Sequence, residues 1–260
     1  MESAMNVDQQ EIGRFDRLAS HFWDARGEFR TLHLLNPVRA AFVADRASIA
    51  NARVLDVGCG GGLLCETLAR MGCHVVGVDM APGMIEVARL HATEQRLDID
   101  YRLTSAEELA ASGEGDFDIV TCMEMIEHVP EPARTMATLA RLVRPRGAVF
   151  ISTINRNLKS FLLAIVGAEY VLGLIPRGTH EYERLIRPSE LARWGRGAGL
   201  ALQELRGLRF NPLTSSCELS RDPSVNYLAH LTRTDERPAR IDDPARIDDP
   251  ARTDSPAAPS

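Results

Sequence analysis

The sequence predicts an α/β protein built around a doubly wound, mainly parallel sheet, and three observations support this. Short apolar runs alternate with stretches of helical spacing between residues 53 and 153. A glycine-rich turn, G-C-G-G-G at 58–62, directly follows the first apolar run. The chain has 260 residues and 45% hydrophobic side chains, enough for one sizeable core. Strand, helix and strand at this spacing imply right-handed crossovers, with helices on both faces of the sheet.

The core elements follow one another along the chain. Strands are expected at residues 53–57, 73–79, 99–103, 117–122 and 147–153. Helices are expected at 63–72, which ends at a glycine, at 81–92, which has a proline near its first turn, and at 131–143. Ligands of such sheets bind at the carboxyl ends of the strands, near the point where the strand order reverses. The glycine turn after the first strand is expected at that place.

Beyond the fifth strand the pattern is less regular. An insertion is expected from residue 155 to about 187. A capped helix at 188–194 and two strands at 200–208 and 225–231 are expected to follow it. The main domain is therefore expected to span residues 51–233.

The two ends of the chain differ from this domain. Residues 1–50 have a helical pattern and form an expected N-terminal helical cap. Its stripe of Phe15, Leu18 and Phe22 either packs against the body or forms a lid over the site. Residues 234–260 repeat Pro, Ala, Arg and Asp, a composition that predicts a disordered tail without a catalytic role.

Composition and charge argue against several classes of protein. The formal net charge is −6, whereas a nucleic-acid partner normally demands a basic face. The five cysteines are odd in number and contain no C-x-x-C pair, which argues against a disulfide framework or a zinc site. This cysteine usage favours the reducing cytoplasm as the expected location, and the polar, acidic N-terminus carries no visible signal-peptide pattern.

The glycine turn does not fit the common phosphate-binding patterns. Gly58 and Gly60 match the dinucleotide fingerprint G-x-G-x-x-G, but its third position is Leu63, and no G-K-[ST] follows. Asp56, inside the preceding strand, would repel a pyrophosphate but can anchor a cationic ligand end. Asp79, at the end of the second strand, can accept hydrogen bonds from both hydroxyls of a ribose. This set suits S-adenosylmethionine, and it argues against an NAD-dependent dehydrogenase.

Longer stretches resemble a known family. The stretches V-L-D-V-G-C-G-G-G, V-V-G-V-D-M and F-D-I-V-T-C-M-E-M-I-E-H-V resemble class I S-adenosylmethionine-dependent methyltransferases, which implies a Rossmann-like sheet. Outside the cofactor core, N-P-V-R at 36–39, S-T-I-N-R-N at 152–157 and P-R-G-T-H at 176–180 resemble the ubiquinone biosynthesis O-methyltransferase family. The likeness runs from about residue 7 to 232, and the proline-rich tail lies outside it.

The resemblance assigns roles to four positions. It implies that Gly58 lies against the methionine part of the cofactor, that Asp79 binds the ribose and that Met123 lines the cleft. It also implies that Arg39 reaches the methionine carboxylate, which suits a guanidinium fork. Asp56 and Gly60 are added from the reasoning on the residues themselves, with strand-turn structure as the alternative role.

The family methylates phenolic hydroxyls of polyprenylated catechol and demethylubiquinol intermediates. Because a phenol titrates near pH ~10, a base is expected beside the acceptor oxygen. Glu124 and His128 are candidate bases, and His180 is another. If the segment turns helically, Glu124, Glu127 and His128 share one face and could hold a divalent cation such as Mg²⁺, as some relatives do. The alternative is that His128 orients the substrate or packs.

The insertion contains an almost wholly apolar stretch at residues 161–176, flanked by Lys159 and Arg177. It is shorter than the roughly 20 residues that span a bilayer. It is expected to be either a buried helix or an interfacial segment that admits a polyprenyl tail. The expected partners are therefore the polyprenylated phenol, the surface of the inner membrane and other enzymes of the ubiquinone pathway.

Two alternatives within this fold stay open. The chain can be a methyltransferase for another small phenol or a carboxylate, because the cofactor motifs do not fix the acceptor. It can also be a non-catalytic adaptor that retains its cofactor fold.

Overall fold

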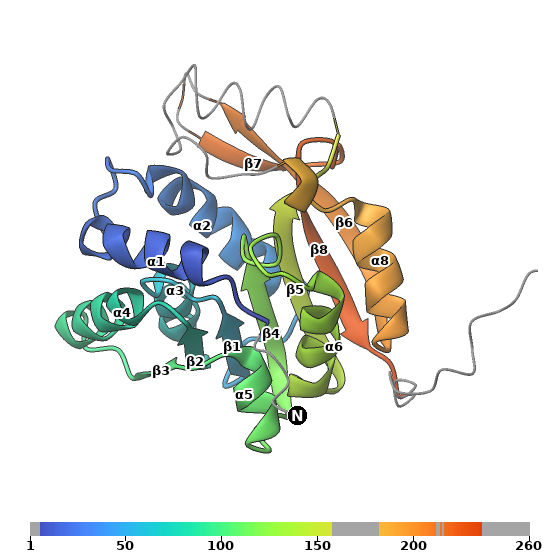
Figure 1. Ribbon diagram of the computed structural model, residues 1–260, viewed down its shortest axis with the longest axis horizontal. Coiled ribbons are helices and arrows are strands. Elements are labelled where there is room, and N and C mark those ends of the chain that lie inside the picture. The colour runs from blue at the N-terminus through green and yellow to red at the C-terminus, as the bar shows by residue number, and fades with distance from the viewer. Residues whose placement is uncertain (1–5, 158–181, 212–213, 215, 236–260) are drawn as a thin grey trace, which may run out of the picture.

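The computed structural model describes residues 6–157, 182–211, 214 and 216–235. Within these residues the strands form one eight-stranded sheet of order β3-β2-β1-β4-β5-β8-β6-β7 (Figure 1). The strands are β1 (Arg53–Val57), β2 (His74–Asp79), β3 (Ile99–Leu103), β4 (Phe117–Met123), β5 (Val143–Ile154), β6 (Leu200–Asn211), β7 (Ser216–Ser220) and β8 (Asn226–Arg233). Strands β1 to β5 pair in parallel, as predicted, whereas β8 runs antiparallel to both β5 and β6.

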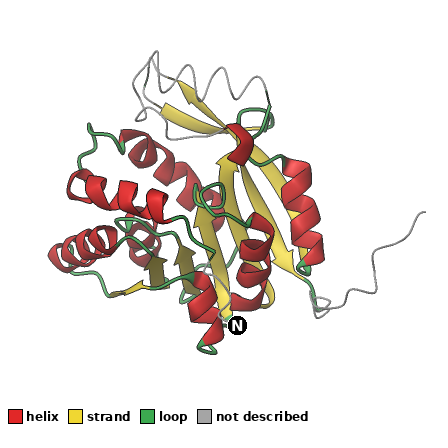
Figure 2. Ribbon diagram, in the orientation of Figure 1, coloured by secondary structure: helices red, strands yellow, loops and turns green. Residues whose placement is uncertain are grey.

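Helices cover both faces of the sheet (Figure 2). Helices α5 (Ala106–Ala111), α6 (Pro132–Leu142) and α8 (Pro188–Gly197) pack on one face. Helices α2 (Arg30–Ala44), α3 (Leu63–Arg70) and α4 (Pro82–Glu94) pack on the other. Helix α1 (Gln9–Leu18) is the first helix of the described chain. The short helices η1 (Ala19–His21) and η3 (Tyr182–Arg184) belong to neither of these two helix layers. No helix among the described residues is both long and apolar enough to cross a membrane.

The point where the strand order reverses lies between β1 and β4. β1 pairs with β2 on one side, where Val57 faces Val78, and with β4 on the other, where Asp56 faces Thr121. The side chains of β1 alternate between the two cores, since Val54 joins one hydrophobic cluster and Leu55 the other. The carboxyl ends of β1, β2 and β4 therefore come together at one edge, where ligands of such sheets bind.

Two elements go beyond the predicted ones. Helix α5 begins at a capping box, in which Ser105 and Glu108 bond each other's backbone N–H groups. Its sequence S-A-E-E has the pattern of such a box, so the signal was present. Strand β7 pairs with β6 in a hairpin, so the chain after α8 forms three strands rather than the two predicted. Strand β5 also starts at Val143, earlier than predicted, because its first residues already lie beside β4.

Candidate active site

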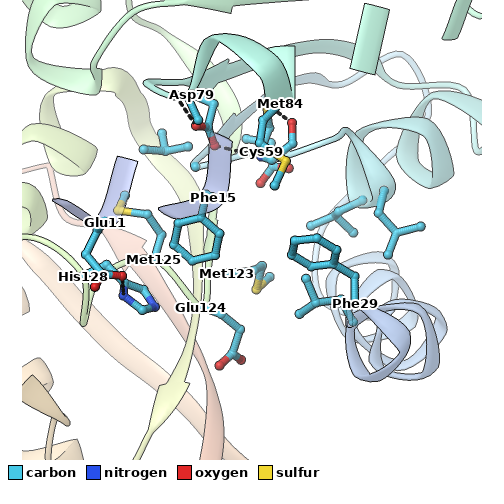
Figure 3. A pocket seen from close by; sticks show the side chains of 18 of the residues that line it. Glu11, Phe15, Phe29, Cys59, Asp79, Met84, Met123, Glu124, Met125 and His128 are labelled. Carbon is cyan, nitrogen blue, oxygen red and sulfur yellow. Dashed lines mark hydrogen bonds and ion pairs between the residues drawn. The ribbon is translucent and has the colours of Figure 1, made fainter. Parts of the chain in front are cut away.

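A cavity of about 720 Å³ lies at the carboxyl ends of β1, β2 and β4 and is also lined by α1 and α2. Figure 3 shows Asp79 and Cys59 at one end, Glu124 and His128 at the other, and Phe15 between them. Its lining includes every cofactor-binding residue predicted from the sequence: Arg39, Asp56, Gly58, Gly60, Asp79 and Met123. The cavity therefore gathers residues that lie far apart in the sequence, from α2 and from three strand ends.

The glycine loop after β1 has a backbone that few other residues adopt. Gly58, Gly60 and Gly62 have φ angles of +72°, +52° and +88°. A Cβ atom added to Gly58 would lie 2.5 Å from Cγ of Met125, and one on Gly62 would lie 2.1 Å from the Tyr101 hydroxyl oxygen. The loop thus combines left-handed backbone with close packing, because Met125 and Tyr101 occupy the space where Cβ atoms on Gly58 and Gly62 would lie.

Asp79 ends β2 and holds this loop directly. Its Oδ2 atom accepts a hydrogen bond from the backbone N–H of Gly60 at 2.9 Å, and its Oδ1 atom accepts one from Ala81 at 2.8 Å. Burial raises the pKa of Asp79, and these backbone hydrogen bonds oppose the rise. The carboxylate therefore has a fixed orientation at the cavity wall, with further lone pairs for a ligand hydroxyl.

Asp56 is more enclosed than Asp79, with an exposed fraction of 3%. Its two oxygens accept hydrogen bonds from the Thr121 hydroxyl at 2.5 Å and from the Cys65 thiol at 3.3 Å. Burial raises the pKa of Asp56 to about 6 in spite of both bonds. Because each oxygen retains a second lone pair, Asp56 can act on a cationic ligand both as an acceptor and through its charge.

Arg39 lies on α2 and is buried, with an exposed fraction of 5%. Its Nη2 atom donates to Oε1 of Glu124 at 2.8 Å, while its Nε atom has no hydrogen-bond partner within the described chain. Glu124 has a positive φ of +51°, and its Oε1 atom also accepts from the Ser152 hydroxyl at 2.7 Å. A non-glycine residue held in this region is typical of functional sites, where surrounding contacts offset the strain.

His128 pairs with a residue from the N-terminal helix. Its Nδ1 atom lies 2.9 Å from Oε2 of Glu11 on α1, and its ring meets that of Phe15 edge-on at a centroid distance of 5.4 Å. Burial lowers the pKa of His128, but the contact with Glu11 and the charges of Glu11, Glu127 and Glu124 outweigh it, so the pKa is raised. The pair joins a base to a carboxylate at the cavity wall (Figure 3).

Comparison with known proteins decides the family. A family model described as "Methyltransferase domain" matches residues 28–205. The ubiquinone biosynthesis O-methyltransferase of Saccharophagus degradans is 54% identical over 87% of this chain and 96% of that protein. The same enzyme of Hahella chejuensis is 53% identical over 90% of this chain and 98% of that protein. The chain belongs to the ubiquinone biosynthesis O-methyltransferase family.

Solved structures confirm the methyltransferase-type fold. Magnesium protoporphyrin IX methyltransferase from Synechocystis PCC 6803 with bound SAH superimposes with a TM-score of 0.64 at 18% identity, over 85% of this chain and 95% of that one. The [4+2]-cyclase SpnF superimposes with a TM-score of 0.62 at 16% identity, over 89% of this chain and 98% of that one. Since these proteins carry out different reactions on one fold, the likeness shows the architecture alone.

The predicted divalent-cation site does not fit the described residues. Residues 124–130 form bends and turns instead of the helical turn that would place Glu124, Glu127 and His128 on one face. Glu124 pairs with Arg39 and His128 with Glu11, whereas Glu127 is 2% exposed and is not among the residues that line the cavity. Burial, together with the charge of Glu124, raises the pKa of Glu127, which favours its neutral form. The described part of the chain contains no group of three acidic, histidine or cysteine side chains able to hold a metal ion.

Two site features were outside the reach of the sequence. Glu11 lies in the first turn of α1, and nothing in the sequence pattern there pointed to His128, which lies more than a hundred residues away. Met125 packs against the position of a missing Cβ atom on Gly58, a contact that only the fold reveals. His180, a predicted base, and the apolar stretch 161–176 lie outside the described residues.

Proposed function

We propose that this chain is an S-adenosylmethionine-dependent O-methyltransferase of ubiquinone biosynthesis, which methylates phenolic hydroxyls of polyprenylated catechol and demethylubiquinol. Membership of the family supports the reaction. The structural observation that carries the proposal is that the glycine loop, Asp79 and Arg39 line the same cavity. These groups match three features of the cofactor, namely its methionine chain, its ribose hydroxyls and its carboxylate.

The residues present fit S-adenosylmethionine. Asp79 is oriented by two backbone N–H groups, and its remaining lone pairs suit the ribose hydroxyls. The buried Nε atom of Arg39 has no partner in the described chain, so a carboxylate would satisfy it. Gly58 and Gly60 let the methionine part approach the backbone, and Met123 lines the cavity beside it. The bound cofactor supplies an electrophilic methyl group on a positively charged sulfur.

The chain's own contribution is to align the acceptor oxygen and to remove its proton. We assign the base to His128, whose raised pKa strengthens it and whose Nδ1 atom faces Glu11. The carboxylate of Glu11 stabilises the imidazolium that forms when the other ring nitrogen takes the phenol proton, as the aspartate does in a catalytic triad. We assign Glu124 to holding Arg39, because it already pairs with that guanidinium at 2.8 Å. His180 stays a second candidate base.

A tail-bearing substrate accounts for the apolar part of the cavity. Leu208 and Phe210 of β6 and Ile154 of β5 line it together with apolar residues of α1. We propose that the polyprenyl tail lies against these side chains and that residues 161–176 rest on the membrane surface, which would place the enzyme at the periphery of the inner membrane. Contacts with other enzymes of the ubiquinone pathway are part of the same proposal.

Flotation with anionic liposomes tests the membrane proposal. Wild-type protein is expected to float, and a variant with Leu162→Asp and Ile165→Asp is expected to stay at the bottom, because charge opposes insertion of an apolar segment. Circular dichroism checks that the variant is folded. Equal flotation of both folded proteins would contradict the proposal.

Incubation with methyl-labelled S-adenosylmethionine and a short-chain prenyl catechol tests the reaction itself. We expect label in the phenolic ether, and little label in a soluble phenol without a prenyl chain. Preferential labelling of the soluble phenol or of a carboxylate would favour another acceptor, and binding of cofactor without transfer to any acceptor would favour an adaptor.

A parallel incubation with a chelator tests whether methyl transfer needs a divalent cation. An unchanged rate of transfer is expected, because the described residues do not form a metal site.

A further inference from the structure

Two aromatic residues from the N-terminal segment lie directly on the glycine loop. Phe22 is 3% exposed. A Cβ atom added to Gly61 would lie 2.2 Å from the Cδ1 atom of Phe22. The indole N–H of Trp23 donates a hydrogen bond to the carbonyl oxygen of Gly61 at 3.1 Å. The stretch F-W, which the sequence pattern placed only in a helical cap, therefore touches the part of the chain expected to hold the cofactor.

Trp23 is itself fixed by a second set of contacts. Its ring stacks flat on the ring of His91 of α4, with centroids 3.5 Å apart and planes 11° apart. The Nδ1 atom of His91 lies 2.5 Å from Oε1 of Glu66, a carboxylate of α3 that is 1% exposed. The other oxygen of Glu66 accepts a hydrogen bond from Arg70 at 2.9 Å. A continuous row of contacts thus runs from two helices of the body through the indole to the glycine loop.

The same N-terminal segment closes one wall of the cavity. Phe15, Leu18 and Phe22 all line it, so the predicted apolar stripe packs against the body and borders the cavity. Asp16 accepts a hydrogen bond from the backbone N–H of Gly83 at 2.6 Å, which joins α1 to the start of α4. The imidazole of His33 contacts the carbonyl oxygen of Phe22 at 2.9 Å, which joins the segment to α2.

We propose that Trp23 is a positioning residue for the cofactor. Through its hydrogen bond to Gly61, Trp23 holds the glycine loop in its binding conformation. The inference rests on the proposed function. A loop with several left-handed glycines loses much backbone entropy when a ligand fixes it. An external hydrogen bond that fixes the loop beforehand removes part of that loss from the binding step. Trp23 therefore contributes to cofactor affinity and leaves the chemistry at the acceptor oxygen unchanged.

The matched test compares Trp23→Phe with Trp194→Phe. Phenylalanine at 23 keeps an aromatic face for His91 but loses the N–H that reaches Gly61. Trp194, the other tryptophan of the chain, lies on α8 and is not among the residues that line the cavity. Titration calorimetry with S-adenosylhomocysteine should give a Kd about tenfold higher for Trp23→Phe, the size expected for one neutral hydrogen bond, and an unchanged Kd for Trp194→Phe.

Kinetics and fluorescence separate positioning from a general loss of structure. In Trp23→Phe the KM for the cofactor should rise while the KM for the acceptor and kcat at saturating cofactor stay within about twofold, because only the cofactor loop is affected. In Trp194→Phe, Trp23 is the sole tryptophan, and its emission should change with the same Kd that calorimetry gives.

An unchanged Kd in Trp23→Phe, or an equal rise of both KM values, would overturn the assignment of Trp23. If wild-type protein binds no S-adenosylhomocysteine at all, the proposed function fails instead. The two failures are therefore distinguishable, and neither needs a variant that removes the aromatic ring at position 23.

Discussion

Asp79 illustrates how one side chain links the fold to the ligand. It fixes Gly60 and Ala81 through their backbone N–H groups, and it is the group expected to bind the ribose. Asp79→Asn keeps the shape but replaces one acceptor oxygen by a donor. We expect the Kd for S-adenosylhomocysteine to rise about 10- to 100-fold, because hydrogen bonds to a charged group are lost. Asp98→Asn, at an exposed position, is the control, and an equal Kd for both variants would contradict the role.

Asp56 makes the stability of the folded chain depend on pH. Burial raises its pKa in the folded chain from 3.8 to about 6. The folded protein then holds this proton more tightly than the unfolded chain, so the contribution to stability is complete below pH 3.8 and is lost as the pH rises through 6. The full change amounts to roughly 3 kcal/mol.

The variant Asp56→Asn should remove this dependence. Between pH 4 and 7 the free energy of unfolding of wild-type protein should fall relative to that of the variant, as measured by urea denaturation without cofactor. A constant difference over that range would show that the carboxyl of Asp56 titrates normally.

Helix α1 brings Glu11 to His128, and this contact is a property of two elements rather than of one residue. Glu11→Gln keeps the side-chain length but removes the charge that raises the pKa of His128. We expect kcat to fall about tenfold and the limb of the pH–rate profile that reports the base to move to lower pH, with an unchanged KM for the cofactor. Glu86→Gln, exposed on α4, is the control. An unshifted pH–rate profile would show that Glu11 does not raise the pKa of the catalytic base.

Two glycines at element ends differ in the space around the position of a Cβ atom. Gly62 and Gly72 have φ angles of +88° and +92°, but only Gly62 has a neighbour where a Cβ atom would lie. Gly72→Ala should cost about 1 kcal/mol of stability through backbone strain alone. Gly62→Ala should cost roughly 1–3 kcal/mol more, because the hydroxyl end of buried Tyr101 must move. Equal losses in urea denaturation would contradict the packing of the loop.

The elements show what could be predicted and why. The parallel core was predictable because β1 and β4 are mostly buried apolar runs and α3 and α4 have clear end signals, Gly72 after the one and Pro82 at the start of the other. The hairpin strand β7 was not, because its alternating pattern is only five residues long and contains just two apolar side chains, Cys217 and Leu219. The cofactor residues were predictable because they follow strand ends, whereas Glu11 reaches the site only through the tertiary docking of α1. The cation prediction depended on a helical turn after β4, and the left-handed backbone at Glu124 redirects the chain there.

At the scale of the whole molecule, the sheet supplies a rigid edge and the N-terminal segment supplies the cover. The strand ends hold Asp56, Asp79 and Met123, and the cover adds Phe15 and Phe22 to the same cavity. Because the strand ends and the N-terminal segment line the same cavity, bound cofactor should stabilise both parts of the folded chain together. At a concentration of about 100 times its Kd, S-adenosylhomocysteine should stabilise the fold by about 2.7 kcal/mol and raise the Tm by several degrees. NAD should produce no shift at the same concentration, and an equal shift with NAD would contradict the assigned ligand.

A crystal structure with bound S-adenosylhomocysteine tests the central claim most directly, since that claim is a placement of one ligand among named groups. We expect the ribose hydroxyls within hydrogen-bond distance of the Asp79 carboxylate, the amino-acid part against Gly58 and the ligand carboxylate at Arg39. A ligand bound outside this cavity, or a ribose that does not contact Asp79, would contradict the account.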